Sequence, residues 1–164
     1  MVAHAKTQPL YTRIYPAVNV TVTPTLDTNA YAAGDILFNP TEVASVTLES
    51  AGYARLVGLS IFDGDAQAAA LDLYILQAST SLGTINTAPN ITDANLDPPN
   101  FQHVVSFVAA DWANISGASV ISWSHEGDGL PCVSSGTSMY IAALTQGTPT
   151  HTASGMVITT WWVR

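Results

Sequence analysis

The sequence predicts an all-β protein, an antiparallel β-sandwich or jelly-roll-like fold that follows an extended N-terminal arm. Three observations predict this fold class. Short runs alternate apolar and polar side chains, which is the period of a half-buried strand. Clusters of Gly, Pro, Asn, Asp and Ser separate about nine such runs, as in sandwiches and jelly rolls. No segment sustains the apolar period of an amphipathic helix, about 3.6 residues.

The chain divides into an arm over residues 1–17 and a single β-domain over residues 18–164. The arm has no periodicity and mixes two cations with aliphatic and aromatic residues. Such a segment is typical of an arm that becomes ordered on a neighbouring surface. Its larger apolar residues are therefore candidate interface residues: Leu10, Tyr11, Ile14 and Tyr15.

The strands of the domain are expected in the following order. Residues 18–23 alternate Val with Asn or Thr, residues 36–38 form a second strand closed by Asn39-Pro40, and residues 43–48 form a third. Residues 53–62 and 71–75 flank the turn-rich stretch "DGDAQAAA" and predict a long hairpin. Later strands are expected at 101–108, 119–123, 138–144 and 156–163.

Two connections have individual predictions. In "AYAAGDIL", Gly34 supplies a positive φ and Asp35 accepts backbone hydrogen bonds, so the stretch is interpreted as a β-corner that fixes register between the first two strands. Residues 79–100 are expected to be a long loop, functional or in contact with a partner. Within it, "ITDANL" is compatible with one helical turn capped by Thr92 or Asp93.

The last strand ends in adjacent tryptophans, Trp161 and Trp162. Neighbouring strand residues point to opposite faces, so one ring can join the core while the other meets a second surface. A large exposed aromatic ring favours an interface, and the pair joins the candidate interface residues.

The charge balance excludes one class of partner. The 164 residues include four Lys or Arg and twelve Asp or Glu, a formal net charge of −8, and charged residues make up 10% of the chain against about 25% in typical domains. So few cations argue against nucleic-acid binding. A surface short of charge is cheap to desolvate, which suits a protein that packs into an assembly.

Residues 1–18 contain no apolar run of signal-peptide length, and no window approaches a membrane span of about 20 apolar residues. We therefore expect a soluble protein that is made in a cytoplasm and has no membrane partner. Cys132 is the one cysteine, so no intrachain disulfide forms, and we interpret it as a structural thiol.

The acidic and histidine motifs are individually incomplete. Asp63 and Asp65 resemble half of a calcium loop, but no Glu follows at the right distance, so a turn is favoured and a bound cation stays open. In "HEGD", His125 and Glu126 are adjacent, which is not a zinc-ligand spacing, and a solvated loop tip is favoured. His4, His103 and His151 are scattered along the chain.

Nothing in the sequence selects a catalytic group. Asp35, Asp72 and Asp111 are candidate members of a glycosidase carboxylate pair, but no feature pairs them. The stretch "SSGTS" lacks the nucleophile-elbow pattern, and no phosphate-loop, dinucleotide or zinc pattern is present. We expect no enzyme, with no catalytic residues, no cofactor and no metal site assigned.

Three blocks of sequence resemble a family of small structural proteins of tailed-bacteriophage virions. They are "VTVTPTLDTNAYAAGDILF", "ALDLYILQASTSLGT" followed by "APNITDANL", and "SMYIAALTQGTPTHTASGMVIT". The resemblance implies a capsid decoration (cement) protein: β-rich, often trimeric, bound to the major capsid protein at capsomer junctions on the capsid exterior. The family has no catalytic residues. The segments before residue 18, "FQHVVSFVAADW" and "ISWSHEGDGLPC" are this chain's own.

Two alternatives remain open. A head-fibre or tail-associated module would bind a host surface glycan and would place exposed aromatic residues in a groove. A carbohydrate-active or calcium-dependent binding domain would require Asp63 and Asp65 to coordinate a metal ion.

Overall fold

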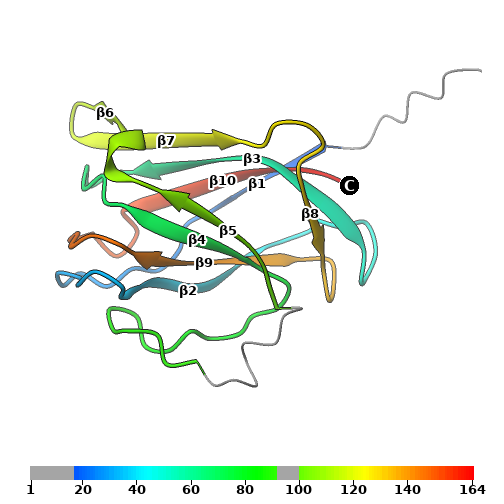
Figure 1. The fold of residues 1–164 in the computed structure, drawn as a ribbon, viewed down its shortest axis with the longest axis horizontal. Helices are drawn as coiled ribbons and strands as arrows, with labels where there is room; N and C mark the ends of the chain where they lie inside the picture. Colours follow the sequence, from blue (N-terminus) through cyan, green and yellow to red (C-terminus); the bar gives the residue numbers. More distant parts are fainter. Residues whose placement is uncertain (1–16, 92–99) are drawn as a thin grey trace, which may run out of the picture.

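The computed structural model describes residues 17–91 and 100–164 and shows two antiparallel sheets packed face to face (Figure 1). This confirms the predicted all-β sandwich. The arm over residues 1–17 and the helical turn in "ITDANL" lie outside the described residues, apart from Ala17 and Ile91. Among the described residues, no helix has the length and hydropathy to cross a membrane.

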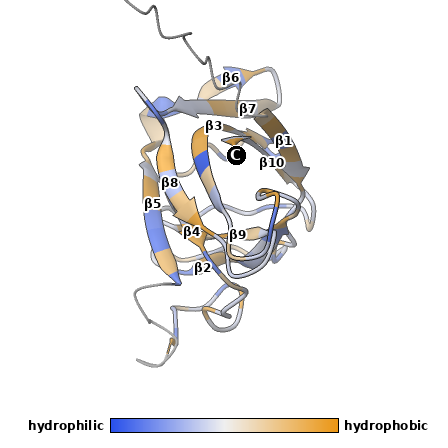
Figure 2. Cartoon of the chain, turned by 90° about the vertical axis from the view of Figure 1, so that its right-hand side faces the viewer, coloured by the Kyte–Doolittle hydropathy of each residue, from blue (hydrophilic) through white to orange (hydrophobic). Residues whose placement is uncertain are grey.

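The six-stranded sheet has the order β1-β10-β3-β7-β6, with β8 also paired to β3, and the four-stranded sheet has the order β2-β9-β4-β5. In Figure 2, β1, β3, β7 and β10 lie in the upper part of the view and β2 and β9 in the lower part, and β8 lies beside β5 at one side. The strands are β1 (Ala17–Val22), β2 (Ile36–Val43), β3 (Tyr53–Asp63), β4 (Leu71–Leu76), β5 (Phe101–Phe107), β6 (Ala113–Ile115), β7 (Ala118–Ser124), β8 (Leu130–Val133), β9 (Met139–Thr145) and β10 (Met156–Val163). A short 3-10 turn, η1 (Ala109–Asp111), precedes β6.

The strand pairs are nested along the chain. The first strand, β1, pairs with the last strand, β10, and the second strand, β2, pairs with the second-to-last, β9. Further inside the sequence, β3 pairs with β7 and β4 pairs with β5. Consecutive strands at the start of the chain therefore alternate between the two sheets. Between the two layers, buried side chains of both sheets meet in one core, which includes Phe38, Leu59, Ile61, Leu73 and Trp162.

Two strand predictions were wrong, and the short strands β6 and β8 were not predicted. Residues 44–48 are turn and bend, because β2 continues through Asn39-Pro40 to Val43 instead of stopping. The missing N–H of Pro40 is tolerated there because β2 is an edge strand whose register shifts between Phe38 and Thr41. The sequence also gave no separate signal for β8, which lies in the turn-rich connection after β7.

The predicted hairpin between 53–62 and 71–75 was also wrong. Strand β3 belongs to the six-stranded sheet and β4 to the four-stranded sheet. Leu59 and Leu73 both face the core, but from opposite layers. Alternation identifies a buried face and does not say which sheet carries it.

The corner at Gly34 and Asp35 is confirmed as a turn. Gly34 has a φ of +91°, and a carboxylate oxygen of Asp35 accepts a hydrogen bond from the N–H of Ala32 at 2.8 Å. The hydroxyl of Tyr31 donates to the carbonyl of Leu37 at 3.1 Å. Because β1 and β2 lie in different sheets, however, the corner does not set a register between them.

The long loop after β4 packs on its own sheet. Leu82 is buried in a second apolar cluster with Ile36, Leu76 and Ala142. Backbone bonds join the loop to the free edge of β2, from the N–H of Ile36 to the carbonyl of Thr87 and from the N–H of Asn86 to the carbonyl of Ile36, both at 2.9 Å. The described part of this loop therefore protects both the face and the edge of the four-stranded sheet.

Candidate functional site

The outer face of the six-stranded sheet carries three rows of uncharged residues. The register of β1, β10, β3 and β7 places in these rows Asn19, Trp161, Gly58 and Ser124; Thr21, Thr159, Ser60 and Ser122; and Val157, Phe62 and Val120. We call these residues the bare face, because the elements that the structure describes include no loop packed over them. Trp161 is 40% exposed and Phe62 43% exposed.

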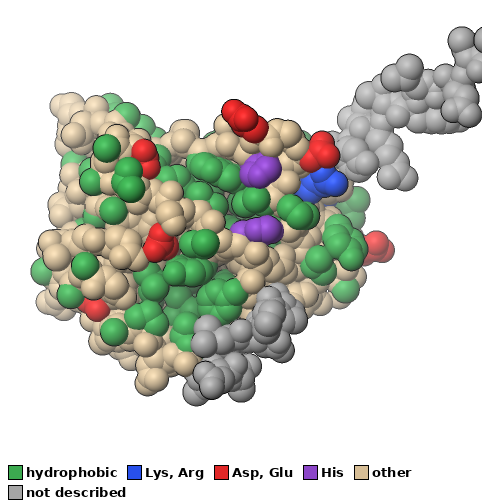
Figure 3. All heavy atoms as spheres, in the orientation of Figure 1, with side chains coloured by type: hydrophobic (Ala, Val, Ile, Leu, Met, Phe, Trp, Pro, Cys, Tyr) green, Lys and Arg blue, Asp and Glu red, His purple; other side chains and the backbone are tan. Residues whose placement is uncertain are grey.

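The residues of the bare face alternate with core residues of the same strands. Thr160, between Thr159 and Trp161, is buried and receives the indole N–H of Trp162 at 2.8 Å. Small hydroxyl side chains fill the central row, where Thr21 and Thr159 hydrogen bond to each other at 2.9 Å. On the side of the molecule drawn in Figure 3, the few acidic side chains lie apart from one another.

The two C-terminal tryptophans point to opposite faces, as predicted. Trp162 has no exposed surface and lies in the core, which revises its place among the candidate interface residues. Trp161 stands on the bare face, where a partner could contact it. The other candidate interface residues, Leu10, Tyr11, Ile14 and Tyr15, lie outside the described residues.

A shallow groove of about 470 Å³ lies beside the Trp161 ring. Gly58 forms its floor, and the hydroxyl side chains of Ser122 and Ser124 line it. A Cβ at residue 58 would stand 3.1 Å from the carbonyl oxygen of Trp123 and 3.6 Å from the Trp161 ring, so the glycine keeps the groove open. A second hollow of about 490 Å³ adjoins it at Val57 and contains the exposed pair Arg55–Asp128, whose charged atoms are 3.0 Å apart.

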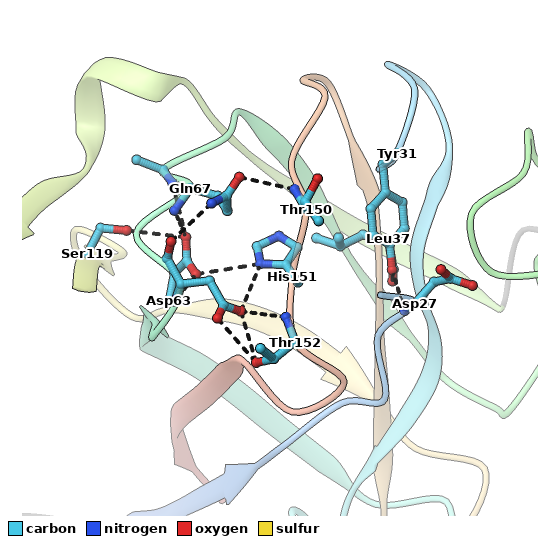
Figure 4. Close-up of polar contacts among 11 residues, drawn as sticks. Asp27, Tyr31, Leu37, Asp63, Gln67, Ser119, Thr150, His151 and Thr152 are labelled. Carbon is cyan, nitrogen blue, oxygen red and sulfur yellow. Dashed lines mark hydrogen bonds and ion pairs between the residues drawn. The ribbon is translucent and has the colours of Figure 1, made fainter. Parts of the chain in front are cut away.

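A separate cluster of Asp63, Asp65 and His151 joins two loops at one end of the sandwich (Figure 4). Nδ1 of His151 lies 3.5 Å from Oδ1 of Asp63 and 3.6 Å from Oδ2 of Asp65. The side chains of Asp63 and His151 are each 1% exposed, and that of Asp65 is 19% exposed. We call these three residues the acid–histidine cluster.

Backbone N–H groups hold Asp63 in place at the end of β3. Its carboxylate accepts hydrogen bonds from the N–H groups of Asp65, Gln67 and Ala68 at 2.7–3.0 Å and from the hydroxyl of Ser119 at 3.3 Å. Burial acts to raise the pKa of Asp63, but the His151 imidazole and the backbone N–H groups of Ala68 and Asp65 lower it below the usual value. The buried carboxyl is therefore charged at neutral pH.

The loop before β10 supplies the other side of the cluster. The N–H of Thr152 donates to Oδ2 of Asp65 at 2.8 Å, and the N–H of Thr150 donates to the side chain of Gln67 at 3.0 Å. Tyr31 places its ring edge-on to the imidazole of His151, with 6.2 Å between ring centroids. The cluster is thus rigidly framed by segments far apart in sequence.

The other candidate residues from the sequence lie apart from the acid–histidine cluster, and each has a different set of contacts. Asp72 accepts a hydrogen bond from Gln146 at 2.7 Å, and Asp111 accepts one from the N–H of Val108 at 2.9 Å. In "HEGD", the His125 ring packs edge-on to Trp123. Cys132 is fully buried, and burial raises the pKa of its thiol to about 12, as expected of a structural cysteine.

Sequence reasoning did not join His151 to the two aspartates. The residues are 86 to 88 positions apart, and His151 sits in a stretch, "TQGTPTHTASG", that was predicted only as a loop. The connection follows from the register of β10 with β3, which pairs Met156 with Asp63 and so brings the preceding loop beside the DGD turn. No local spacing carries that information.

Comparisons with known proteins do not identify a family for this chain. No protein-family model and no curated protein matches the chain. A crystal structure of the infectious bursal disease virus VP2 subviral particle aligns with 99% of this chain and 42% of its own, at 11% identity and a TM-score of 0.26. A structure of the infectious bursal disease virus Gx strain aligns with 90% of this chain and 36% of its own, at 14% identity and a TM-score of 0.21. This chain spans less than half of either one, and likenesses at these TM-scores carry no information about function.

Proposed function

We propose that this protein is a structural component of a bacteriophage particle, and specifically a capsid decoration protein. In this role it binds the outer surface of the icosahedral head at capsomer junctions, contacts the major capsid protein and further copies of itself, and stabilises the shell. The proposal rests on the resemblance of three sequence blocks to small virion proteins. The observation in the structure that supports it best is the bare face.

The bare face has the properties of a surface that docks onto another protein. Hydroxyl and apolar side chains cost less to remove from water than charged ones, and none of the eleven residues in its three rows is charged. Trp161 stands in the first row, and tryptophan is the residue type that most often dominates binding energy at interfaces. The bare face therefore has a low cost of desolvation and includes, in Trp161, a side chain that can contribute strongly to binding.

The architecture is compatible with this role. We infer a jelly roll from the nested strand pairs, which join the outermost strands of the chain first and β4 with β5 last. Jelly rolls occur in viral capsid domains and also in lectin domains, so the architecture alone does not choose between a shell partner and a sugar.

A decoration protein stabilises a shell by binding the assembled form in preference to free capsid subunits. Each contact can be weak, because several copies joined as a homo-oligomer, for example a trimer, combine their contacts on one shell. The residues 1–17 arm is expected to add its own contacts with the shell or with a sister subunit.

Occupancy on purified empty heads that lack the protein tests the proposal. Trp161→Ala should reduce affinity for the heads by about 30-fold, the loss typical of an interface hot spot. Val104→Ala, on the exposed surface of β5, is the matched control and should leave occupancy unchanged. Deleting residues 2–16 should also reduce occupancy. Wild-type occupancy for both Trp161→Ala and the deletion would refute docking through these surfaces.

The second candidate function is a head-fibre or tail-associated module that binds a host surface glycan. The groove beside Trp161 favours it, because an aromatic ring next to the hydroxyl groups of Ser122 and Ser124 can contact a sugar through both its apolar face and its hydroxyl groups. Copy number distinguishes the two functions. Quantitative mass spectrometry of virions should find hundreds of copies of a decoration protein, whereas a handful of copies would favour the fibre or tail module.

A further inference from the structure

The acid–histidine cluster brings together three metal-ligating side chains whose nearest polar atoms point at one another. We propose that Asp63, Asp65 and His151 bind a divalent metal ion of the zinc class, through Oδ1, Oδ2 and Nδ1 respectively. The ion would join the loop after β3 to the loop before β10. This inference does not depend on the proposed virion role.

The separations fit a shared ion better than direct hydrogen bonds. Nδ1 of His151 is 3.5 and 3.6 Å from the two carboxylate oxygens, whereas an N–H···O bond is about 2.9 Å long. Ligands at about 2.0–2.1 Å from a tetrahedral zinc ion lie about 3.3–3.4 Å apart. All three ligand atoms lie within 4.8 Å of one another, close enough to share such an ion with little adjustment.

The histidine supplies independent evidence for a ligand. Neither ring nitrogen of His151 has a hydrogen-bond partner, and its side chain is 1% exposed. Buried polar atoms nearly always have a hydrogen-bond partner, whereas Nδ1 of His151 has only the two carboxylates at 3.5 and 3.6 Å, beyond the usual hydrogen-bond length, and Nε2 has no partner. A cation between them would take up the Nδ1 lone pair and offset the repulsion between Asp63 and Asp65.

The surrounding residues fix the ligands in advance. Asp63 is held by the backbone of its own loop, and Asp65 is held by Thr152. Gly155 lies directly beneath the Asp65 carboxylate, and a Cβ at residue 155 would overlap Oδ2 of Asp65. Of the three side chains, that of Asp65 is the most exposed, at 19%. These are features of a preorganised site.

The ligand set selects the class of ion. Calcium and magnesium take oxygen ligands, and calcium uses six to eight of them, whereas zinc accepts imidazole nitrogen together with carboxylate oxygen. Asp63 and Asp65 alone resemble half of a calcium loop. With His151 as the third ligand, the set fits zinc and not calcium.

Metal titration of the full-length chain, without a polyhistidine tag and stripped with a chelator, tests the site. Calorimetry with Zn²⁺ should show one binding site per chain, and the melting temperature should rise with Zn²⁺ because the ion binds only the folded state. Calcium should cause neither effect. His151→Gln should abolish both Zn²⁺ effects. The matched control, His125→Gln, removes another histidine whose Nδ1 is buried and unpaired, and it should bind Zn²⁺ as the wild type does.

A second variant keeps the test decisive if His151→Gln does not fold. Gly155→Ala leaves all three ligands in the chain but displaces the Asp65 carboxylate, and it should weaken Zn²⁺ affinity about 10- to 100-fold. The proposal is overturned if the wild type shows no site-specific Zn²⁺ binding. Undiminished Zn²⁺ affinity in a folded His151→Gln or Gly155→Ala variant would also overturn it, as would calcium binding that survives the loss of His151.

Discussion

On the outer face of the four-stranded sheet, a segment of the same chain covers parts of β2, β9 and β4 and leaves Val104 on β5 exposed. No described segment covers the bare face of the six-stranded sheet. Leu82 and its neighbours after β4 bury Ile36, Leu76 and Ala142 in a second apolar cluster. The corresponding rows on the six-stranded sheet expose Trp161 and Phe62 beside Thr and Ser side chains. The two faces belong to one sandwich and share one core, so they invite direct comparison.

This difference separates two uses of apolar surface. On the four-stranded sheet, Ile36 and Leu76 would be exposed without the loop, and the chain itself removes them from water. On the six-stranded sheet, the residues around Trp161 are mostly small and hydroxylic, which keeps an uncovered face soluble. Trp161 is the large aromatic side chain of this face that the proposed docking role uses as its anchor.

The largest expected effect is on the labelling rate of Cys132, which reports how closely the core side of the six-stranded sheet is packed. Cys132 on β8 is fully buried, and its pKa of about 12 makes the reactive thiolate about a thousandfold scarcer at neutral pH than it would be at the ordinary value of 9.0. Labelling with a thiol reagent should therefore be slow in native buffer and fast in denaturant. Rapid native labelling would mean that this sheet is loose, and the comparison would lose its basis.

The covered face is expected to contribute strongly to stability. Leu82→Ala removes a side chain that is 1% exposed, and we expect the free energy of unfolding to fall by about 2–5 kcal/mol. Val104→Thr, on an exposed position of β5, is the control and should change it by less than about 0.5 kcal/mol. Urea denaturation measures both. A loss for Leu82→Ala as small as the control's would show that the loop only rests on the sheet.

A smaller loss of stability is expected when the hydrogen bonds between Asn39 and the loop after β4 are removed. The Asn39 side chain donates to the carbonyl of Gly83 at 2.8 Å and accepts from the N–H of Leu82 at 2.9 Å. Asn39→Ala should cost about 1–2 kcal/mol, because it removes both bonds and leaves the N–H of Leu82 without this acceptor. Asn39→Asp keeps the acceptor and should fall between the two in the same denaturation experiment. Equal stability of all three proteins would contradict this account of the loop.

The smallest effect on stability is expected on the bare face itself. Thr159→Lys places a charge in the middle row, beside the small side chains of Ser60 and Thr21, where a lysine can extend into solvent. The free energy of unfolding should change by no more than about 0.5 kcal/mol in urea denaturation. A large loss would indicate that this face contributes to folding, and a stability role would replace the docking role.

The sequence predicted local structure well and long-range assembly poorly. Alternation located most strands, and the adjacent tryptophans correctly predicted one buried and one outward ring, because these signals reside in neighbouring residues. The assignment of β3 and β4 to one hairpin failed, since alternation is blind to which sheet a strand joins. Pro40 misled the prediction of β2 because an edge strand tolerates a missing N–H.

The acid–histidine cluster illustrates the same limit. Asp63 and Asp65 were visible as a motif because they are two residues apart, but His151 became their neighbour only through the pairing of β10 with β3. The need for glycine at residue 155 likewise depends on where the Asp65 carboxylate lies in three dimensions. The bare face was foreseen only at Trp161, because its rows are assembled from four strands.

Binding of Thr159→Lys to empty heads tests the central claim most directly, since this variant is expected to keep its fold. The matched control is Val104→Lys, which adds the same charge to the exposed surface of β5. Head occupancy should fall sharply for Thr159→Lys and stay at the wild-type level for Val104→Lys. Equal occupancy for the two lysine variants, whether both bind or both fail, would contradict docking through the bare face.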